Sequence, residues 1–346
     1  MRNLASLTLA LLLVYACLGN LARAFDIEEE QHFPTDKPSR SLRILSNTDL
    51  NYFAPLIHAY QKRHTDIEVL YTVASSKELY QAIYEEGAPY DLVISSAMDL
   101  QVKLVNDGLS RAHSSSSTEP MPGWAKWRNH LFAFTQEPAV LLASKQWFKD
   151  SAIPQNRQEL ISQLRNNPDR FMGKIGTYDI RESGAGYLFA TQDARQSDAY
   201  WRLAEVFGAL KPKLYCCSSK MLDALESGEI AMAYNVVGSY ASAVLNENSN
   251  GFIVPLSDYT HFMLRTALIP AHANNPETAG EFIDFLVGSP GRKLIQEQAG
   301  LPPINGEALA KQQHFRPITL GPGLLVYLDK IKRQRFLKEW TDAMIR

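Results

Sequence analysis

Short apolar runs in the first third of the chain are each followed by a hydroxyl-rich turn and then by an amphipathic segment. The pattern predicts strands at residues 42–45, 67–73 and 91–94. Helices are predicted from about Phe53 and after the capping-box pair Ser75 and Glu78. This βαβαβ order is typical of a doubly wound, mainly parallel α/β sheet, whose ligands bind outside the carboxyl ends of the strands. We expect five hydroxyl side chains to face a ligand there: Ser46, Thr48, Ser75, Ser76 and Ser95.

Residues 214–240, LYCCSSKMLDALESGEIAMAYNVVGSY, have the order strand, loop, helix, strand, loop. Ser218 and Ser219 offer N-cap oxygens to the helix, which ends at Gly228. A buried strand then stops at Asn235, and a loop of small residues follows it at 238–240. Both loops are predicted to carry ligand groups, and the candidates are Cys216, Cys217, Ser218, Ser219, Asn235, Ser239 and Tyr240.

An arginine and two glycines lie between a predicted strand at 174–178 and the next helix, in the segment DIRESGAGY (179–187). Arg181 has five N–H donors, Ser183 can cap the helix, and Gly184 leaves the backbone N–H groups accessible. The only acid evident beside Arg181 is Glu182, so we expect Arg181 to bind an anion. The alternative is a helix cap that binds nothing.

Two long apolar segments, residues 131–143 and 262–269, are predicted strands that leave the first lobe of the protein and return to it. The predicted division is lobe one at 42–134 plus 266–346 and lobe two at 135–265. Residues 25–41, acidic and then proline-bearing, are typical of a flexible leader. Helical stretches are expected at 145–170 and 324–346.

Residues 1–24 have the pattern of a cleavable signal peptide. A positive Arg2 precedes a short apolar stretch, and Ala22-Arg23-Ala24 fits a cleavage site. The alternative, a membrane anchor, is disfavoured because the stretch is shorter than the roughly 20 residues that a spanning helix needs. Cleavage predicts a periplasmic protein that begins at Phe25. The rest of the 346-residue chain has the composition of a soluble protein large enough for two domains.

Charge argues against nucleic acid as a partner. Cleavage would remove two of the 35 basic residues and none of the 37 acidic ones, which leaves a net charge of −4. No long basic stripe is present, and residues 330–335 are expected to form the solvated face of a helix.

Cysteine usage excludes a disulfide scaffold and a cysteine metal cluster, because cleavage also removes Cys17 and leaves only Cys216-Cys217. These two cysteines can form only a strained ring with each other, since neighbouring Cα atoms lie about 3.8 Å apart and disulfides usually need ~4.4–6.8 Å. The alternative is a pair of reduced thiols that pack as small apolar residues.

Enzymatic chemistry is disfavoured. The segment around Ser183 resembles only part of a nucleophile elbow, because the glycine two positions before the serine is absent. The eight histidines are scattered without metal-ligand spacing. We therefore predict no catalytic residues, no metal and no cofactor.

The segment PETAGEFIDFLVGSPGRKLIQEQAGLPP (276–303) resembles the extracytoplasmic solute-binding proteins of ABC importers, in particular their ferric-iron branch. IRESGAGY and the 214–240 segment look closest to phosphoglycerate-transport regulatory proteins and other binding proteins encoded beside two-component systems. The resemblance implies a type 2 periplasmic binding protein fold, with two doubly wound sheets, a hinge of two crossovers and an interlobe cleft. It also implies a monomer whose partner is an ABC permease or a sensor histidine kinase.

The ligand is expected to differ from that of the iron-binding members. Those proteins have two adjacent tyrosines in the region corresponding to residues 235–241, where this chain has only Tyr240. The hydroxyl, amide and glycine groups around Arg181 suit a small phosphorylated or carboxylated molecule instead. Ferric iron or an iron chelate is the alternative ligand.

Overall fold

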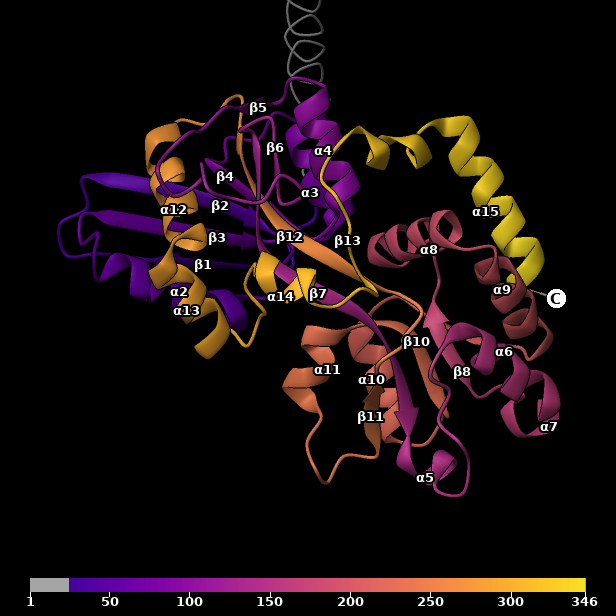
Figure 1. Ribbon diagram of the computed structural model, residues 1–346. Coiled ribbons are helices and arrows are strands. Elements are labelled where there is room, and N and C mark those ends of the chain that lie inside the picture. Colours follow the sequence, from indigo (N-terminus) through magenta and orange to yellow (C-terminus); the bar gives the residue numbers. More distant parts are fainter. Residues whose placement is uncertain (1–24, 346) are drawn as a thin grey trace, which may run out of the picture.

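The computed structural model of the protein describes residues 25–345. The predicted signal peptide, residues 1–24, lies outside them. Two α/β lobes lie side by side, joined by long strands that run between them (Figure 1). The strands are β1 (Glu29–Phe33), β2 (Arg40–Ser46), β3 (Ile67–Val73), β4 (Leu92–Ser95), β5 (Ser110–Arg111), β6 (Lys126–Trp127), β7 (Leu131–Ser144), β8 (Ile175–Tyr178), β9 (Lys213–Tyr215), β10 (Met232–Val237), β11 (Gly251–Val254), β12 (Thr260–Pro270) and β13 (Phe315–Pro317).

The helices alternate with these strands. They are α2 (Leu50–Gln61), α3 (Ser76–Tyr84), α4 (Met98–Asn106), α5 (Lys145–Phe148), α6 (Arg157–Asn166), α7 (Pro168–Phe171), α8 (Gly184–Gln196), α9 (Ala199–Ala209), α10 (Ser218–Glu226), α11 (Gly238–Val244), α12 (Pro276–Val287), α13 (Ser289–Glu297), α14 (Gly306–Ala310), the 3-10 helix η1 (Pro322–Tyr327) and α15 (Lys330–Met344).

The sheet runs in the order β1-β3-β2-β4-β12-β7-β10-β8-β9. Strand β2 is parallel to both β3 and β4 in the first lobe, and β8 is parallel to both β9 and β10 in the second. Strand β7 joins the two groups, because its residues 132–138 pair with β12 and its residues 139–144 pair with β10 and β11. The carboxyl ends of the parallel strands of both lobes consequently face the space between them.

Helices cover both faces of the first-lobe sheet, as strand alternation requires. Ile44 of β2 belongs to a core that includes residues of α2, α12 and α13. Its neighbour Leu45 belongs to the other core, with residues of α3 and α4. The sheet is therefore buried on both sides, as in doubly wound folds.

The prediction that residues 25–41 form a flexible leader is wrong in part. Strand β1 pairs antiparallel with β3 at the edge of the sheet, and Phe33 is buried in the core. Sequence reasoning missed β1 because the other side chains of this edge strand are exposed and polar, so only its backbone reveals a strand. The helical stretch predicted at 145–170 is likewise three short helices, α5, α6 and α7.

The C-terminal segment contacts both lobes. The 3-10 helix η1 packs on α4 of the first lobe, while α15 packs on α9 of the second (Figure 1). The Tyr187 hydroxyl on α8 donates a hydrogen bond to the Tyr327 carbonyl at 2.6 Å. The division expected from the sequence assigns all of 266–346 to lobe one, so the position of α15 differs from it.

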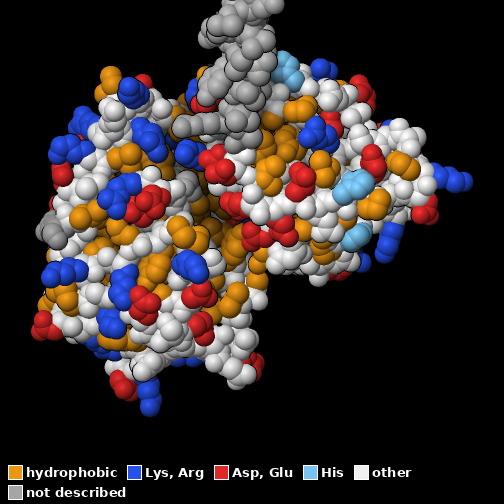
Figure 2. Space-filling view, turned by 180° about the vertical axis from the view of Figure 1, so that it is seen from behind, with side chains coloured by type: hydrophobic (Ala, Val, Ile, Leu, Met, Phe, Trp, Pro, Cys, Tyr) orange, Lys and Arg blue, Asp and Glu red, His pale blue; other side chains and the backbone are white. Residues whose placement is uncertain are grey.

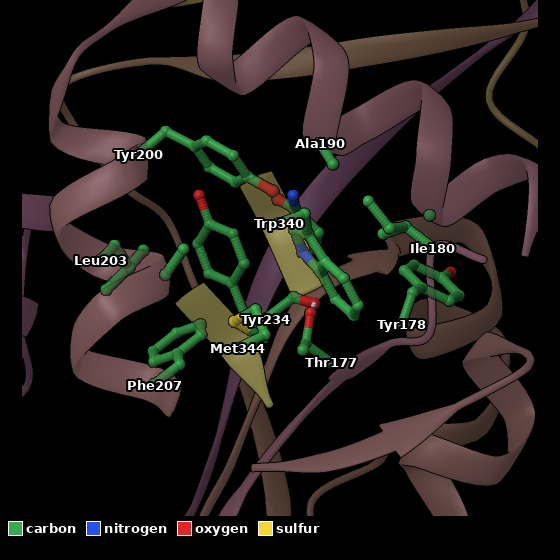
Figure 3. Close-up of a pocket in the computed structure, with 13 residues that line it drawn as sticks. Thr177, Tyr178, Ile180, Ala190, Tyr200, Leu203, Phe207, Tyr234, Trp340 and Met344 are labelled. Carbon is green, nitrogen blue, oxygen red and sulfur yellow. Dashed lines mark hydrogen bonds between the residues drawn. The ribbon is translucent and has the colours of Figure 1, made fainter. Parts of the chain in front are cut away.

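Trp340 anchors α15 on the second lobe. Its buried side chain lies among residues of β8, α9 and β10, beside a small cavity of about 20 Å³ (Figure 3). Tyr200, Tyr234 and Thr177 also line this cavity, which has room for about one water molecule.

Candidate functional site

A cleft of about 710 Å³ lies between the lobes and is lined by residues of both. Figure 2 shows the hollow between the lobes from behind. The first turns of α3, α8 and α10 contribute to its walls, and Leu328 and Arg333 of the C-terminal segment contribute as well. The first N–H groups of a helix have no intrahelical acceptor, and its N-terminus carries partial positive charge. Three helix starts around one cleft favour a negatively charged ligand.

The first-lobe wall is built from serines and Asn47. Ser75 caps α3, because its Oγ accepts a hydrogen bond from the Glu78 N–H at 3.2 Å, as the capping-box spacing predicts. The Asn47 amide donates to Ser76 Oγ at 2.7 Å and to Ser96 Oγ at 2.9 Å. Asn47 thereby ties two cleft serines to the end of β2. Asn47 and Ser96 were not predicted as site residues.

Arg181 lies in the cleft, but an acid that sequence reasoning missed already holds it. Its Nε donates to Asp179 Oδ1 at 2.8 Å, and its Nη2 donates to Asp179 Oδ2 at 2.5 Å. The guanidinium hydrogen bonds lower the pKa of the Asp179 carboxyl. The chain turns after β8, which brings the side chains of residues 179 and 181 together. Nη1 makes no hydrogen bond within residues 25–345, and the side chain is 45% exposed.

Helix α8 begins as predicted. Ser183 is its N-cap, and the Ser183 Oγ accepts a hydrogen bond from the Gly186 N–H at 3.2 Å. Gly184 and Ala185 of the first turn line the cleft. No atom lies within 4 Å of the position that a Gly184 Cβ would take, so a ligand can approach the backbone there closely.

Helix α10 begins at Ser218 with Cys217 as its N-cap, so neither predicted serine caps it. Ser218 lines the cleft but is mostly buried. Its Oγ lies 2.5 Å from the Tyr178 hydroxyl and accepts a hydrogen bond from the Val237 N–H at 3.1 Å. Ser219, Cys216 and Cys217 also line the cleft, on its second-lobe wall.

Five predicted site residues lie outside the cleft lining, and their side chains are buried and hydrogen-bonded within the protein. Ser46 and Ser95 are buried, and their Oγ atoms accept hydrogen bonds from the backbone N–H groups of Thr48 and Ala97, two residues further on. The Asn235 amide donates to Asp193 at 2.8 Å inside the second lobe. Asn235 adopts a left-handed φ of 63° at a β-bulge, so β10 continues to Val237 instead of stopping there.

Thr48 and Ser239 belong to a buried ion-pair network below the cleft. Arg265 of β12 donates to Glu137 of β7 at 3.1 Å and to Thr48 Oγ1 at 2.6 Å. Ser239 donates to the same carboxylate. Ser239 lies on α11, a short helix where a loop was predicted. Arg265 lines the cleft floor, although its charge is balanced by Glu137.

Three further charged residues of the cleft, Arg333, Asp99 and Lys77, were not foreseen. Arg333 of α15, on the expected solvated face, lies over the Tyr187 ring at 5.1 Å and lines the cleft. Asp99 at the start of α4 is buried, which raises the pKa of its carboxyl to about 6. Exposed Lys77 adds another cation to the first-lobe wall.

Tyr240 lines the cleft where α11 meets the first lobe. Its ring contacts that of Tyr52 on α2 edge to face, with the centroids 5.8 Å apart. Burial raises the pKa of the Tyr240 hydroxyl to about 12, so it is a neutral phenol at pH 7.

Among residues 25–345, no group of three or more His, Cys, Asp or Glu side chains is placed to hold a metal ion. In the same part of the chain, no helix combines the length and the apolar character that crossing a membrane requires.

Comparison with known proteins identifies the family. Residues 43–301 match the model of the bacterial extracellular solute-binding proteins, and the chain belongs to that family. It is also similar to the crystal structure of the substrate-binding protein of the ABC transporter from Agrobacterium tumefaciens. That likeness has 34% identity and a TM-score of 0.83, and it covers 91% of this chain and 98% of the other. The family is one of binding proteins and not of enzymes, as the sequence predicted.

More distant structures share the fold. Iron-bound HitA from Pseudomonas aeruginosa is 18% identical with a TM-score of 0.70, covering 90% of this chain and 99% of HitA. AfuA from Actinobacillus pleuropneumoniae, with exogenous fructose-6-phosphate bound, is 17% identical with a TM-score of 0.69, covering 88% and 99%. The predicted type 2 fold is confirmed. Comparison with curated proteins finds no match.

Proposed function

We propose that the protein is a periplasmic solute-binding protein that captures a small phosphorylated or carboxylated molecule in the interlobe cleft. The observation that carries the proposal is the meeting of the α3, α8 and α10 N-termini around this cleft, beside Arg181. Helix N-termini with hydroxyl side chains bind oxyanions through backbone N–H groups as well as through charge.

The charges of the cleft suit a ligand of limited negative charge. The cations Lys77, Arg181, Arg265 and Arg333 line it together with the acids Glu28, Asp49, Asp99 and Glu182. Arg265 is neutralised by Glu137, and Arg181 is partly neutralised by Asp179. The acids can accept hydrogen bonds from hydroxyl groups of a ligand, so a hydroxylated organic anion fits better than a bare inorganic one.

Free ferric iron fits the cleft poorly. Ferric iron prefers several hard anionic oxygen ligands, whereas Tyr240 has no adjacent tyrosine and the ring that it contacts, Tyr52, lies on the other lobe. HitA is an iron-bound structure and AfuA holds fructose-6-phosphate, and this chain shares their fold. The chemistry of its cleft favours the second kind of ligand.

The bound protein would present its ligand to an ABC permease or to the periplasmic domain of a sensor histidine kinase. The similar protein from Agrobacterium tumefaciens belongs to an ABC transporter, which favours the permease. Deletion of the gene should then abolish uptake of the ligand. Lost gene induction with uptake intact would instead identify the kinase as the partner.

A thermal-shift screen tests the proposed ligand class. The panel holds phosphorylated sugars and acids, di- and tricarboxylates, ferric citrate and free ferric iron. A ligand at 100 times its Kd should stabilise the folded protein by about 2.7 kcal/mol. Stabilisation by at least one organic anion is expected. Stabilisation by ferric iron and by none of the anions would contradict the proposal.

A further inference from the structure

Two thiols face each other in the wall of the cleft. Cys216 follows β9, Cys217 is the N-cap of α10, and their Sγ atoms lie 2.7 Å apart without a disulfide bond between them. Cys216 is exposed and Cys217 is half-buried, and both line the ligand space. The structure describes no other cysteine, so within residues 25–345 these thiols can react only with each other or with an incoming molecule.

The two thiols differ chemically. Burial opposes ionisation of Cys217, but hydrogen bonds from the Cys216 thiol and from Ser219 Oγ, 3.5 Å away, outweigh it and lower the pKa of Cys217. The N-terminus of α10 and Lys220 also favour its thiolate. The pKa of Cys216 is raised by its hydrogen bond to Cys217 and by burial. One thiol that ionises more readily beside one that keeps its proton more firmly is the arrangement of a reactive dithiol.

We propose that Cys216-Cys217 is a redox site, which closes to an eight-membered disulfide ring and thereby changes the affinity of the cleft for its anion. Cys217 thiolate attacks one sulfur of a disulfide oxidant, which is a protein disulfide or oxidised glutathione, and expels a thiolate. The Cys216 thiol then loses its proton, and its sulfur attacks Cys217 Sγ and expels the second thiolate. The ring gains one S–S bond and the oxidant loses its own, taking up two electrons. It leaves as two thiolates, one of which takes the proton from Cys216 and the other a proton from water.

A ring between adjacent cysteines is suited to switching. Neighbouring Cα atoms are closer than an ordinary disulfide requires, and strained disulfides are the readily reduced, regulatory ones. Ring opening therefore needs only a mild thiol reductant. A disulfide that merely stabilised the fold would resist such a reductant.

The effect on the ligand follows from charge, and this step rests on the proposed function. The reduced pair can place a thiolate at the N-terminus of α10, where the ligand anion would otherwise interact with the helix. The ring is neutral. Charges at a helix terminus have modest effects, so oxidation should tighten anion binding by about two- to fivefold.

Mass spectrometry tests ring formation without reference to any ligand. The protein from Phe25 to Arg346 is equilibrated with glutathione buffers of increasing oxidised fraction, alkylated under denaturing conditions and weighed. We expect a change from two alkylated thiols to none, with a mass two hydrogens lower, reversed by reductant. Two alkylatable thiols in every buffer would overturn the proposal.

Single variants test the assigned roles. Cys216→Ser should accumulate a glutathione adduct on Cys217, because the thiolate that attacks remains and the thiol that resolves the adduct is gone. Cys217→Ser should form its adduct at least several-fold more slowly. Equal rates for both variants would contradict the assignment of Cys217 as the nucleophile.

Calorimetric titration with inorganic phosphate as the probe tests the link to the cleft. The oxidised protein should bind phosphate about two- to fivefold more tightly than the reduced protein, and the double Cys→Ser variant should show no redox dependence. Equal affinity in both states would overturn the link. Lack of phosphate and organic-anion binding in either state would instead refute the proposed function, and the mass measurement would still report on the ring.

Discussion

Replacing Arg181 with alanine should weaken binding of the organic anion by about 10- to 100-fold. Asp179 occupies the Nε and one Nη2 donor of the guanidinium, which leaves Nη1 to contact a ligand. A hydrogen bond to a charged group contributes about 1.5–3 kcal/mol, which corresponds to this range. Because the side chain is 45% exposed, solvent screening places the expected loss toward its lower end.

Asp179 makes the prediction sharper. In Arg181→Ala its carboxylate loses its partner and stays close to the bound anion, so part of the loss is repulsion. Adding Asp179→Asn to Arg181→Ala should therefore restore about two- to fivefold of the affinity, the usual size of such a partly exposed charge interaction. Alone, Asp179→Asn should strengthen binding slightly, because more of the Arg181 charge is available.

Isothermal titration with the strongest anion of the thermal-shift panel measures these affinities. Arg335→Ala is the matched control, since this arginine pairs with Glu339 on the exposed face of α15 and does not line the cleft. The control should bind like the wild type. Affinity within twofold of the wild type for Arg181→Ala would refute the assigned role, as would a double variant weaker than the single one.

Three further predictions concern stability and shape. Burial raises the pKa of Asp99 to about 6 from 3.8, so the folded protein holds a proton that the unfolded chain releases, and stability falls as pH rises from about 4 to 6. In urea unfolding, Asp99→Asn should therefore stabilise the protein by about 2–3 kcal/mol at pH 7 and should have no effect below pH ~4. An equal gain in stability at both pH values would contradict this. Trp340→Ala should lower the free energy of unfolding by about 3–5 kcal/mol. Ile331 is 76% exposed on the same helix, so Ile331→Ala should lower it by less than ~0.5 kcal/mol, and equal losses would mean that Trp340 does not anchor α15. Small-angle scattering should show compaction when the ligand is added, and micromolar binding without a change of shape would refute hinge closure.

Local patterns were sufficient for much of the fold. Ile67–Val73 alternates like a half-buried strand, and β3 has these bounds. Ser75 and Ser183 cap helices as predicted, because capping depends on groups only three positions apart in the chain. Strand β7 was predictable from its length, since the mostly apolar segment 131–143 is longer than a strand of one lobe needs.

The position of each hydroxyl could not be predicted from such patterns. Ser46 and Ser95 lie at strand ends, and Ser75 lies at a helix start, so all three are in similar loops. The side chains of Ser46 and Ser95 nevertheless accept hydrogen bonds from the backbone N–H groups two residues further on. Pattern alone does not distinguish a serine that faces a ligand from one that completes its own turn. Asn235 was misplaced because its bulge depends on a buried partner, Asp193, 42 residues away.

Long-range contacts explain the charged groups that were missed. Arg333 reaches the cleft only because Trp340 fixes α15 on the second lobe. Arg265 pairs with Glu137 across two neighbouring strands that are 128 residues apart in sequence. Neither contact leaves a local signal in the sequence.

A crystal structure of the protein with the strongest anion of the panel would show whether the interlobe cleft captures it. We expect the anion to lie between the lobes, with its acidic group in hydrogen-bond contact with backbone N–H groups at the start of α8 or α10 and with Arg181. An anion bound outside the cleft, or bound in the cleft without contact to these helix N-termini, would contradict this expectation.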